Sequence, residues 1–334
     1  MTDRLDSFVA AISPPAAPAE GGLAYAVRPL PGAGHYRVGK NSDGLPAFLV
    51  RSTPRDRPIP FRLQHLAIRP DVTCTVIDAS GVTVRESLAI ITCESNDPEL
   101  QSYFLRVVST LLESIPAQEE SGQLSHALAA VASLFRALES PPRKQVAGLW
   151  AELFLILQAG DARRLAAAWH ADPAEMHDFL EGADRLEVKG AQSGRRHHFR
   201  LEQLDESGGS RIVVASMNVR PVGNGPTVGD LLVRLGSRAG VDAQLRAKLE
   251  RVVADTLGDS WRAGATEGFD EEWAHATLAF YAASDVPQPG PPPLGVSEIR
   301  FVSDLDLSTA GPLHGPPDFG SLLDAARSPT RSPR

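Results

Sequence analysis

Hydrophobic and polar positions alternate along the segment from Tyr25 to about Glu94. Short apolar runs there are separated by Gly, Pro, Asp and Ser, as in HYRVG, PAFLVR, VTCTVID and VTVRESLAIITC. Alternation with a period of two is typical of β-strands, and the residues between the runs favour turns. Residues 23–95 are therefore predicted to form a β-rich N-terminal unit. The Pro-, Ala- and Gly-rich residues 1–22 before it are predicted to be a flexible leader.

A different pattern follows, in which apolar residues recur three and four positions apart. It predicts helices over about 97–115, 121–139 and 143–159. Strand-like runs return between residues 174 and 222 as MHDFL, RLEVKG, RRHHFRL and RIVVASMNV. Helical patterns then cover TVGDLLVRLGSR and about 241–283, and the Pro-rich stretch VPQPGPPP leads to a last strand candidate, VSEIRFVSDLDLS.

These patterns predict an α/β protein whose main core is a mixed central sheet flanked by helices. We assign that core to residues 143–235, after a helical connector at 96–142. A C-terminal segment with helices and a strand covers 236–308. The tail, residues 309–334, is rich in Pro, Gly, Ser and Arg and is predicted to be disordered.

Composition narrows the function classes. The chain of 334 residues is long enough for two packed units, and its net charge of −8 argues against a protein that coats nucleic acid by bulk electrostatics. The two cysteines are too few for a disulfide framework or a four-cysteine zinc site. No run of about 18 apolar residues and no signal-peptide layout occurs, so we expect a soluble, cytoplasmic protein without a membrane partner.

The stretch RLEVKG places Glu187 and Lys189 on one face of a strand. If residues 181–184 form a hairpin loop, Phe179 lies opposite Leu186 and Asp178 lies opposite Glu187. Facing carboxylates repel one another and therefore need a cation. Lys189 can supply it as a simple ion pair, and a bound metal ion can supply it as well.

A third carboxylate lies in an unusual place. Glu152 is the only charged residue in the helical stretch VAGLWAELFLILQAG, and no face of that helix is plainly polar. A buried carboxylate costs several kcal/mol unless it is protonated, paired or bound to metal. A hydrogen-bonded pairing with an arginine or the backbone is the structural alternative.

A divalent metal site is one interpretation of these charged residues, namely Glu152, Asp178, Glu187 and Lys189. Carboxylate oxygens on rigid elements suit Mg²⁺ or Mn²⁺, which also accept phosphate oxygens as ligands. Such an ion polarises a phosphodiester, and a lysine beside it can hold the attacking water and offset developing negative charge. Metal-assisted phosphodiester hydrolysis is the hypothesis that follows.

The segments GLWAELF, HDFL, LEVKG and HFRLEQL, in that order, resemble the PD-(D/E)xK nuclease superfamily, in particular the PD-(D/E)xK-motif proteins of bacterial restriction and phage-defence loci. The resemblance implies a restriction-endonuclease-like core and Mg²⁺- or Mn²⁺-dependent DNA cleavage. It makes Asp178 and Glu187 metal ligands, Glu152 the acid that completes the metal site, and Lys189 the catalytic lysine. The proline of the signature is replaced by His177.

The resemblance also makes Gln203 an accessory residue that orients substrate or water; a surface glutamine on a short helix is the alternative. It implies DNA as substrate and other proteins of a defence system as partners. A homodimer is expected as well, because two cuts on a duplex need two sites.

A basic cluster follows the strand that carries Lys189. Such residues can hold DNA phosphates without reading sequence, or they can form a solvated edge strand. The DNA-binding candidates are Arg195, Arg196, His198 and Arg200.

Two other functions stay open at this stage. The chain could be a non-catalytic scaffold or DNA-binding subunit with a nuclease-like fold, or a DNA repair or junction-resolving nuclease. The sequence GHYRVGKN matches a phosphate-binding loop only in part, because Asn41 stands where Ser or Thr would hold Mg²⁺.

Overall fold

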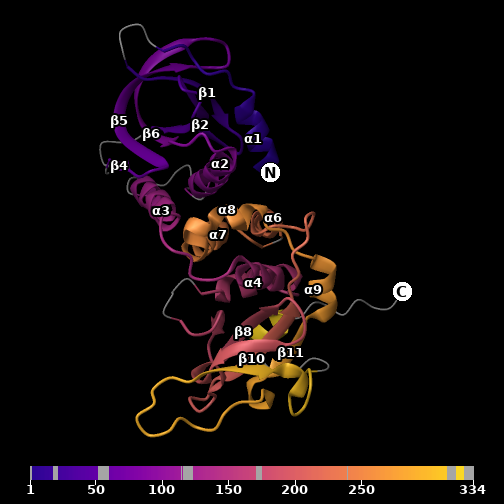
Figure 1. The fold of residues 1–334 in the computed structure, drawn as a ribbon. Coiled ribbons are helices and arrows are strands. Elements are labelled where there is room, and N and C mark those ends of the chain that lie inside the picture. The colour runs from indigo at the N-terminus through magenta and orange to yellow at the C-terminus, as the bar shows by residue number, and fades with distance from the viewer. Residues whose placement is uncertain are drawn as a thin grey trace. The chain divides into compact units, whose positions relative to one another are not determined.

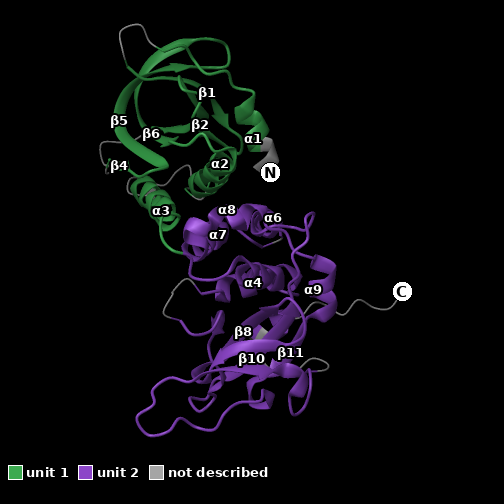
Figure 2. Ribbon diagram, viewed as in Figure 1, with its two compact units in different colours: residues 1–141 green, residues 142–334 purple. Residues whose placement is uncertain are grey.

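The computed structural model describes residues 2–17, 22–51, 60–113, 115, 123–170, 175–238, 240–313 and 321–326. The chain divides into two compact units, unit 1 with residues 1–141 and unit 2 with residues 142–334 (Figure 2). The helices predicted as a connector over 96–142 fall within unit 1. The protein is mixed α/β, as the sequence predicts.

Unit 1 is built on a sheet that closes on itself. Neighbouring strands follow the order β1-β2-β3-β6-β5, and β1 also pairs with β5 in parallel, which closes the ring. The strands are β1 (Ala24–Leu30), β2 (Ala33–Asn41), β3 (Pro46–Val50), β5 (Leu66–Ile77) and β6 (Thr83–Cys93), with β4 (Phe61–Arg62) beside β5. Alternate residues of these strands fill the interior, among them Tyr25, Leu49, Val76 and Ile90.

The described residues of unit 1 also form the helices α1 (Thr2–Ala10), α2 (Pro98–Glu113) and α3 (Gln123–Ala137). Contacts join α1 to α2 and β2, α2 to β2 and β3, and α3 to β5. The segment predicted to be a loose leader therefore contains a helix. This helix forms because Leu5 and Val9, four residues apart, give it a short apolar face that is buried, and Ile12 just after the helix is buried too.

Unit 2 contains a mixed four-stranded sheet (Figure 1). Its order is β11-β10-β8-β7, in which β8 and β10 are parallel and the other neighbours antiparallel. The strands are β7 (Phe179–Glu181), β8 (Asp184–Ala191), β10 (Arg211–Asn218) and β11 (Ala279–Ala282). The connection from β8 to β10 runs through β9 (Arg196–Arg200), which pairs with β12 (Arg300–Asp304) in a separate two-stranded sheet.

Helix α4 (Val146–Gln158) is buried along almost its whole length, which explains its nearly unbroken apolar sequence. It contacts β8, α5, α6 and α7. Further helices of unit 2 are α5 (Ala162–Ala168), α6 (Val228–Gly236), α7 (Ala243–Leu257), α8 (Trp261–Thr266) and α9 (Glu271–Thr277). Short 3₁₀ turns are η1 (Leu201–Leu204), η2 (Gly258–Ser260), η3 (Ala283–Asp285) and η4 (Leu305–Leu307).

Two details of unit 2 differ from the sequence prediction. β11 interrupts the stretch predicted as helix, and α10 (Ser321–Ala326) lies inside the tail predicted to be disordered. α10 docks on α5, β8 and α4, with Leu322 fully buried and the Asp161 amide donating to the Ala325 carbonyl at 3.1 Å. Residues 314–320 and 327–334 of that tail lie outside the described residues.

Within the described part of the chain, no helix has both the length and the apolar character needed to cross a membrane.

Candidate active site

The β7–β8 hairpin has the predicted register. Phe179 pairs with Leu186, and the ladder extends to Glu181 and Asp184, so the turn is two residues long rather than four. Gly182 occupies the turn at a φ of 56°, a conformation that favours glycine. The hairpin therefore brings the segment before β7 alongside the middle of β8.

Asp178 lies just before β7 and is not paired with Glu187 in the ladder. Its Oδ2 accepts a hydrogen bond from the Val188 amide at 2.8 Å instead. The backbone on its other side is fixed by an isolated bridge between Trp169 and Phe179, and by a bond from the His170 amide to the Asp178 carbonyl at 3.2 Å. Asp178 thus lies between β8 and the end of α5.

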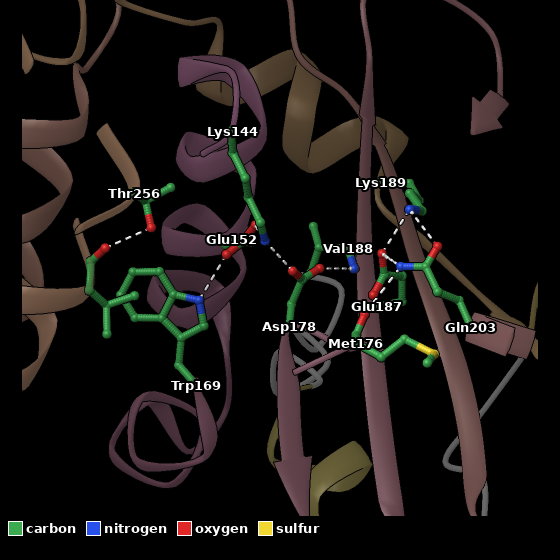
Figure 3. Close-up of polar contacts among 11 residues, drawn as sticks. Lys144, Glu152, Trp169, Met176, Asp178, Glu187, Val188, Lys189, Gln203 and Thr256 are labelled. Carbon is green, nitrogen blue, oxygen red and sulfur yellow. Dashed lines mark hydrogen bonds and ion pairs between the residues drawn. The ribbon is translucent and has the colours of Figure 1, made fainter. Parts of the chain in front are cut away.

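Lys144 joins two of the predicted carboxylates (Figure 3). Its ammonium donates to Glu152 Oε1 at 2.6 Å and to Asp178 Oδ1. Trp169 Nε1 donates to the other oxygen of Glu152, Oε2, at 2.8 Å. Glu152 is therefore buried and paired, and its partners are a lysine and an indole rather than an arginine.

Sequence reasoning missed Lys144, although a signal for it exists. The chain has only four lysines, at positions 40, 144, 189 and 248, while its remaining basic residues are arginines. Two of those four lysines lie at this site. The lysine ammonium is a compact charge with three donors, so it can bond to two carboxylates at once.

Glu187 and Lys189 lie on one face of β8, as the alternation predicts. Lys189 Nζ is 2.7 Å from Glu187 Oε1, and Gln203 Nε2 donates to the same oxygen at 2.8 Å (Figure 3). Gln203 Oε1 lies 3.5 Å from Lys189 Nζ and accepts from the Arg200 amide at 3.0 Å. The structure thus places Gln203 beside the lysine.

The three carboxylates are almost fully buried, with 3% of Glu152, 5% of Asp178 and 4% of Glu187 exposed. Burial raises the pKa of Glu152 to about 8 and that of Glu187 to about 7, and the Asp178 charge adds to both shifts. Burial would also raise the pKa of Asp178, but Lys144 and the Val188 amide hold it below its usual value. Asp178 is therefore the carboxylate that stays charged.

A cavity of about 580 Å³ opens beside these groups. Asp178, Glu187 and Lys189 form part of its wall, so the buried acids face a space that can hold a ligand. The wall is completed by Arg143, Lys144, His170, Glu175, Met176, His198, Phe199, Arg200, Gln203, Val252, Asp255, Thr256 and Arg300.

The basic cluster after β8 divides into residues at the cavity and residues away from it. His198 and Arg200 are exposed and line the cavity, as does Arg300 opposite Arg200 on β12. Arg196 is exposed on the same strand but does not line the cavity. Arg300 was not among the residues that the sequence suggested.

Arg195, the other predicted DNA-binding residue, is turned into unit 2. Its guanidinium donates to the Ser216 carbonyl at 3.1 Å and to the Thr277 carbonyl at 2.6 Å, and it lies near Asp306. These bonds hold β9 against β10 and α9. We therefore do not place Arg195 on a DNA-binding surface.

The carboxylate set has the chemistry that a hard divalent cation needs, although the side chains are not closed around a single point. No three His, Cys, Asp or Glu side chains of the described residues form a ready metal cluster. Glu187 Oε2, however, is buried, and no donor among those residues reaches it. A buried acceptor without a partner, next to Asp178, fits a cation, so Asp178 and Glu187 suit a divalent ion.

Comparison with known proteins gives one result. No curated protein and no solved structure matches the chain significantly. A family model does match, over residues 36–306, and its description reads "Putative PD-(D/E)XK family member, (DUF4420)". That range covers most of the chain and contains every residue of the site described above. The chain belongs to the DUF4420 family of PD-(D/E)XK proteins.

Proposed function

We propose that the protein is a DNA endonuclease that depends on Mg²⁺ or Mn²⁺, with a restriction-endonuclease-like core in unit 2. The observation that carries the proposal is the convergence of Asp178, Glu187, Lys189 and Gln203 at the wall of one cavity. Membership of the PD-(D/E)XK family supports a nuclease, because that combination of acids and lysine is the one its signature names.

The roles follow from the positions of the side chains. Asp178 and Glu187 would hold the ion, which when bound polarises the scissile phosphate and offsets the charge that develops on it. The Lys189 ammonium lies 2.7 Å from Glu187 and at the cavity wall, where it can orient an attacking water and stabilise a phosphate oxygen. Gln203 fixes the Glu187 carboxylate and faces the same ammonium.

DNA is the substrate that the cavity rim suits. His198, Arg200 and Arg300 lie along β9 and β12, where they can contact consecutive phosphates. The net charge of −8 favours an enzyme that meets DNA with the help of partner proteins. We place this nuclease in a cytoplasmic bacterial restriction or phage-defence system, acting as a homodimer when it cuts both strands.

The experiment is a cleavage assay on the purified full-length chain. Supercoiled plasmid, linear duplex, single strands and a four-way junction are incubated with Mg²⁺, Mn²⁺ or EDTA. Lys189→Ala is expected to reduce cleavage by about 10²- to 10⁴-fold, and Glu187→Gln to abolish it. Lys40→Met is the control, since this lysine lies in unit 1, away from the site, and bonds to the Ala10 carbonyl. Intact DNA in every metal condition, alone and with its partner proteins, would falsify the proposal. Cleavage confined to the junction points instead to a repair or junction-resolving enzyme.

A non-catalytic DNA-binding subunit is the second candidate. It is favoured by the Lys144 ion pairs, which partly neutralise Glu152 and Asp178 without any metal. Calorimetric titration with Mn²⁺ separates the two functions: a nuclease takes up the ion, whereas a scaffold with a permanently paired site does not.

A further inference from the structure

One ammonium fills the space between two buried carboxylates. Lys144 precedes α4, and its Nζ bonds to Glu152 on that helix and to Asp178 at the start of the hairpin (Figure 3). A positive charge that bridges carboxylates from a helix and a sheet is the arrangement that a shared metal ion would have. Lys144 therefore stands where a cation is needed.

When all three acids of the site are ionised, their negative charges are not balanced by the lysines that bond to them. Three buried carboxylates, Glu152, Asp178 and Glu187, are bonded by two ammonium groups among the described residues, those of Lys144 and Lys189. Buried charge without compensation is costly, and Glu187 Oε2 is an acceptor that no described donor reaches. Exchange of one ammonium for a divalent ion would balance the three acids and supply the missing partner.

The two lysines differ in exposure, because 35% of the Lys144 side chain is exposed and 17% of the Lys189 side chain. Lys189 bonds to Glu187, lies 3.5 Å from Gln203 Oε1 and covers the Phe199 ring at 4.9 Å. Lys144 has its two carboxylate partners, its side chain is 35% exposed, and it lines the cavity, so its flexible stem has space into which to move. Glu152 would stay in place, because Trp169 holds its second oxygen.

We propose that Lys144 is a positioning residue that holds Glu152 and Asp178 in the metal-free protein and is displaced into the cavity when a divalent cation binds. The inference rests on the proposed metal-dependent function. It adds that Lys144 competes with the metal ion for the same carboxylates. Metal binding would then free the Lys144 ammonium from its two carboxylates, so that it can contact a phosphate in the cavity that it already lines.

The first test follows the lysines of the wild-type chain directly. Because there are four, acylation by an amine-reactive ester can be measured at each of them by peptide mass spectrometry, with and without Mg²⁺. The acylation rate of Lys144 is expected to rise by about tenfold when Mg²⁺ is added, because the side chain leaves the two carboxylates that keep it protonated and its neutral amine, the form that reacts, becomes accessible. Lys40, in unit 1, is the internal control and should not change. An unchanged rate at Lys144 in protein that has bound Mg²⁺ overturns the inference.

The second test uses thermal unfolding with Mn²⁺ as the probe. Lys144→Met removes the charge and is expected to lower the melting temperature in EDTA, because two buried carboxylates then face each other. Mn²⁺ should restore the loss, so its stabilising effect is larger in this variant than in the wild type. Lys248→Met also removes a lysine of unit 2, one that bonds to the Ala166 and Ala167 carbonyls, and Mn²⁺ should not repair that change.

A double variant covers the case in which Lys144→Met does not fold. Lys144→Met with Glu152→Gln removes both charges, and it should fold in EDTA and bind Mn²⁺ less tightly than the wild type. If Lys144→Met is recovered only with Mn²⁺ present and unfolds in EDTA, the exchange is supported. If Mn²⁺ stabilises it no more than the wild type, or the double variant is no more stable than the single one, the inference is wrong.

The outcomes separate the inference from the proposed function. Cleavage of DNA and uptake of Mg²⁺ without any change at Lys144 reject the displacement and leave the nuclease standing. Absence of metal uptake by calorimetry rejects both. Displacement of Lys144 by Mg²⁺ without cleavage of any DNA form keeps the inference and rejects the nuclease.

Discussion

Gln203 Nε2 donates to Glu187 Oε1 at 2.8 Å, although the two residues belong to η1 and β8. The same amide nitrogen reaches the Met176 carbonyl at 3.2 Å, so Gln203 connects three separate segments at the cavity. Its carbonyl oxygen lies 3.5 Å from Lys189 Nζ. Gln203 therefore fixes the directions of both a predicted ligand and the predicted catalytic amine.

Removal of the Gln203 amide should slow cleavage more than it destabilises the protein. Gln203→Ala leaves Glu187 and Lys189 paired but free to rotate, and we expect a drop of about 10- to 100-fold in the cleavage rate. Single-turnover kinetics at saturating Mg²⁺ measure it. Gln101→Ala is the matched control, because that side-chain amide lies in unit 1 and bonds to the Ser95 carbonyl. A rate equal to that of the control would show that Gln203 is a surface residue without a role in the site.

The metal-free protein should lose stability as the pH rises. The pKa of Glu187 is raised to about 7 and that of Glu152 to about 8, in both cases mainly by burial, from an ordinary value of 4.5. Between the ordinary pKa of 4.5 and the raised values of about 7 and 8, the folded state binds more protons than the unfolded state. The free energy of unfolding therefore falls as the pH rises through this range. In EDTA we expect a loss of about 2 kcal/mol or more between roughly pH 5 and pH 8, measured by urea denaturation.

The variants Glu152→Gln and Glu187→Gln should each flatten that pH dependence, because an amide does not titrate in this range. Saturating Mg²⁺ should flatten it as well if the ion compensates the ionised carboxylates. A free energy of unfolding that rises from about pH 5 to pH 8 in EDTA would mean that the two acids are charged and well compensated in the folded protein.

DNA binding should depend on Arg200 and Arg300 but not on Arg195. Each of the first two is exposed at the cavity, so its change to Ala should lower the slope of log affinity against log salt by about one. Arg195→Ala should leave the slope unchanged and destabilise the fold, since its guanidinium bonds to buried carbonyls. Fluorescence anisotropy with a labelled duplex in Ca²⁺ measures the slope. Equal slopes for all three variants and the wild type would remove this surface from the DNA interface.

Loss of the Trp169 indole nitrogen should destabilise the protein, because Glu152 loses a hydrogen-bond donor. Trp169→Phe keeps the ring buried but leaves Glu152 Oε2 without its donor, which costs about 1 to 3 kcal/mol of unfolding free energy. Trp273→Phe is the control, because Trp273 is 42% exposed and its loss should cost little. If both variants unfold at the same urea concentration as the wild type, the Trp169 bond contributes no stability.

The sequence predicted most of the strands and helices because their periodicities are local properties. Alternation located β8 and its register with β7, since a strand with one buried face has a single favourable pairing. The order of motifs likewise located Glu152, Asp178, Glu187, Lys189 and Gln203, and the structure gathers all five in one region of unit 2. What local patterns predict is which residues share a face.

Features that depend on distant pairing were not predictable. Closure of the barrel needs β1 to pair with β5, and nothing in either strand specifies that partner. The rarity of lysine in the chain could have drawn attention to Lys144, but its place between Glu152 and Asp178 arises only when α4 and the hairpin meet. The inward direction of the Arg195 side chain could not be predicted, because exposed and inward-facing arginines look alike in a sequence.

Composition predicted a disordered tail, but the structure contains the docked helix α10 there. Loss of its buried leucine tests that docking. Leu322 is fully buried against the rest of unit 2, so Leu322→Ala should cost about 2 to 5 kcal/mol of unfolding free energy. Leu294→Ala is the matched control, because that leucine is completely exposed and should change stability by less than about 0.5 kcal/mol. Urea denaturation measures the free energy of unfolding of both variants.

Leu322→Ala should also disturb the site. The Ala325 carbonyl of α10 accepts from the Asp161 amide, Asp161 caps α5, and α5 is followed by Trp169, which bonds to Glu152. Equal stability of the two variants would show that the helix is not docked and that the tail contributes nothing to the core.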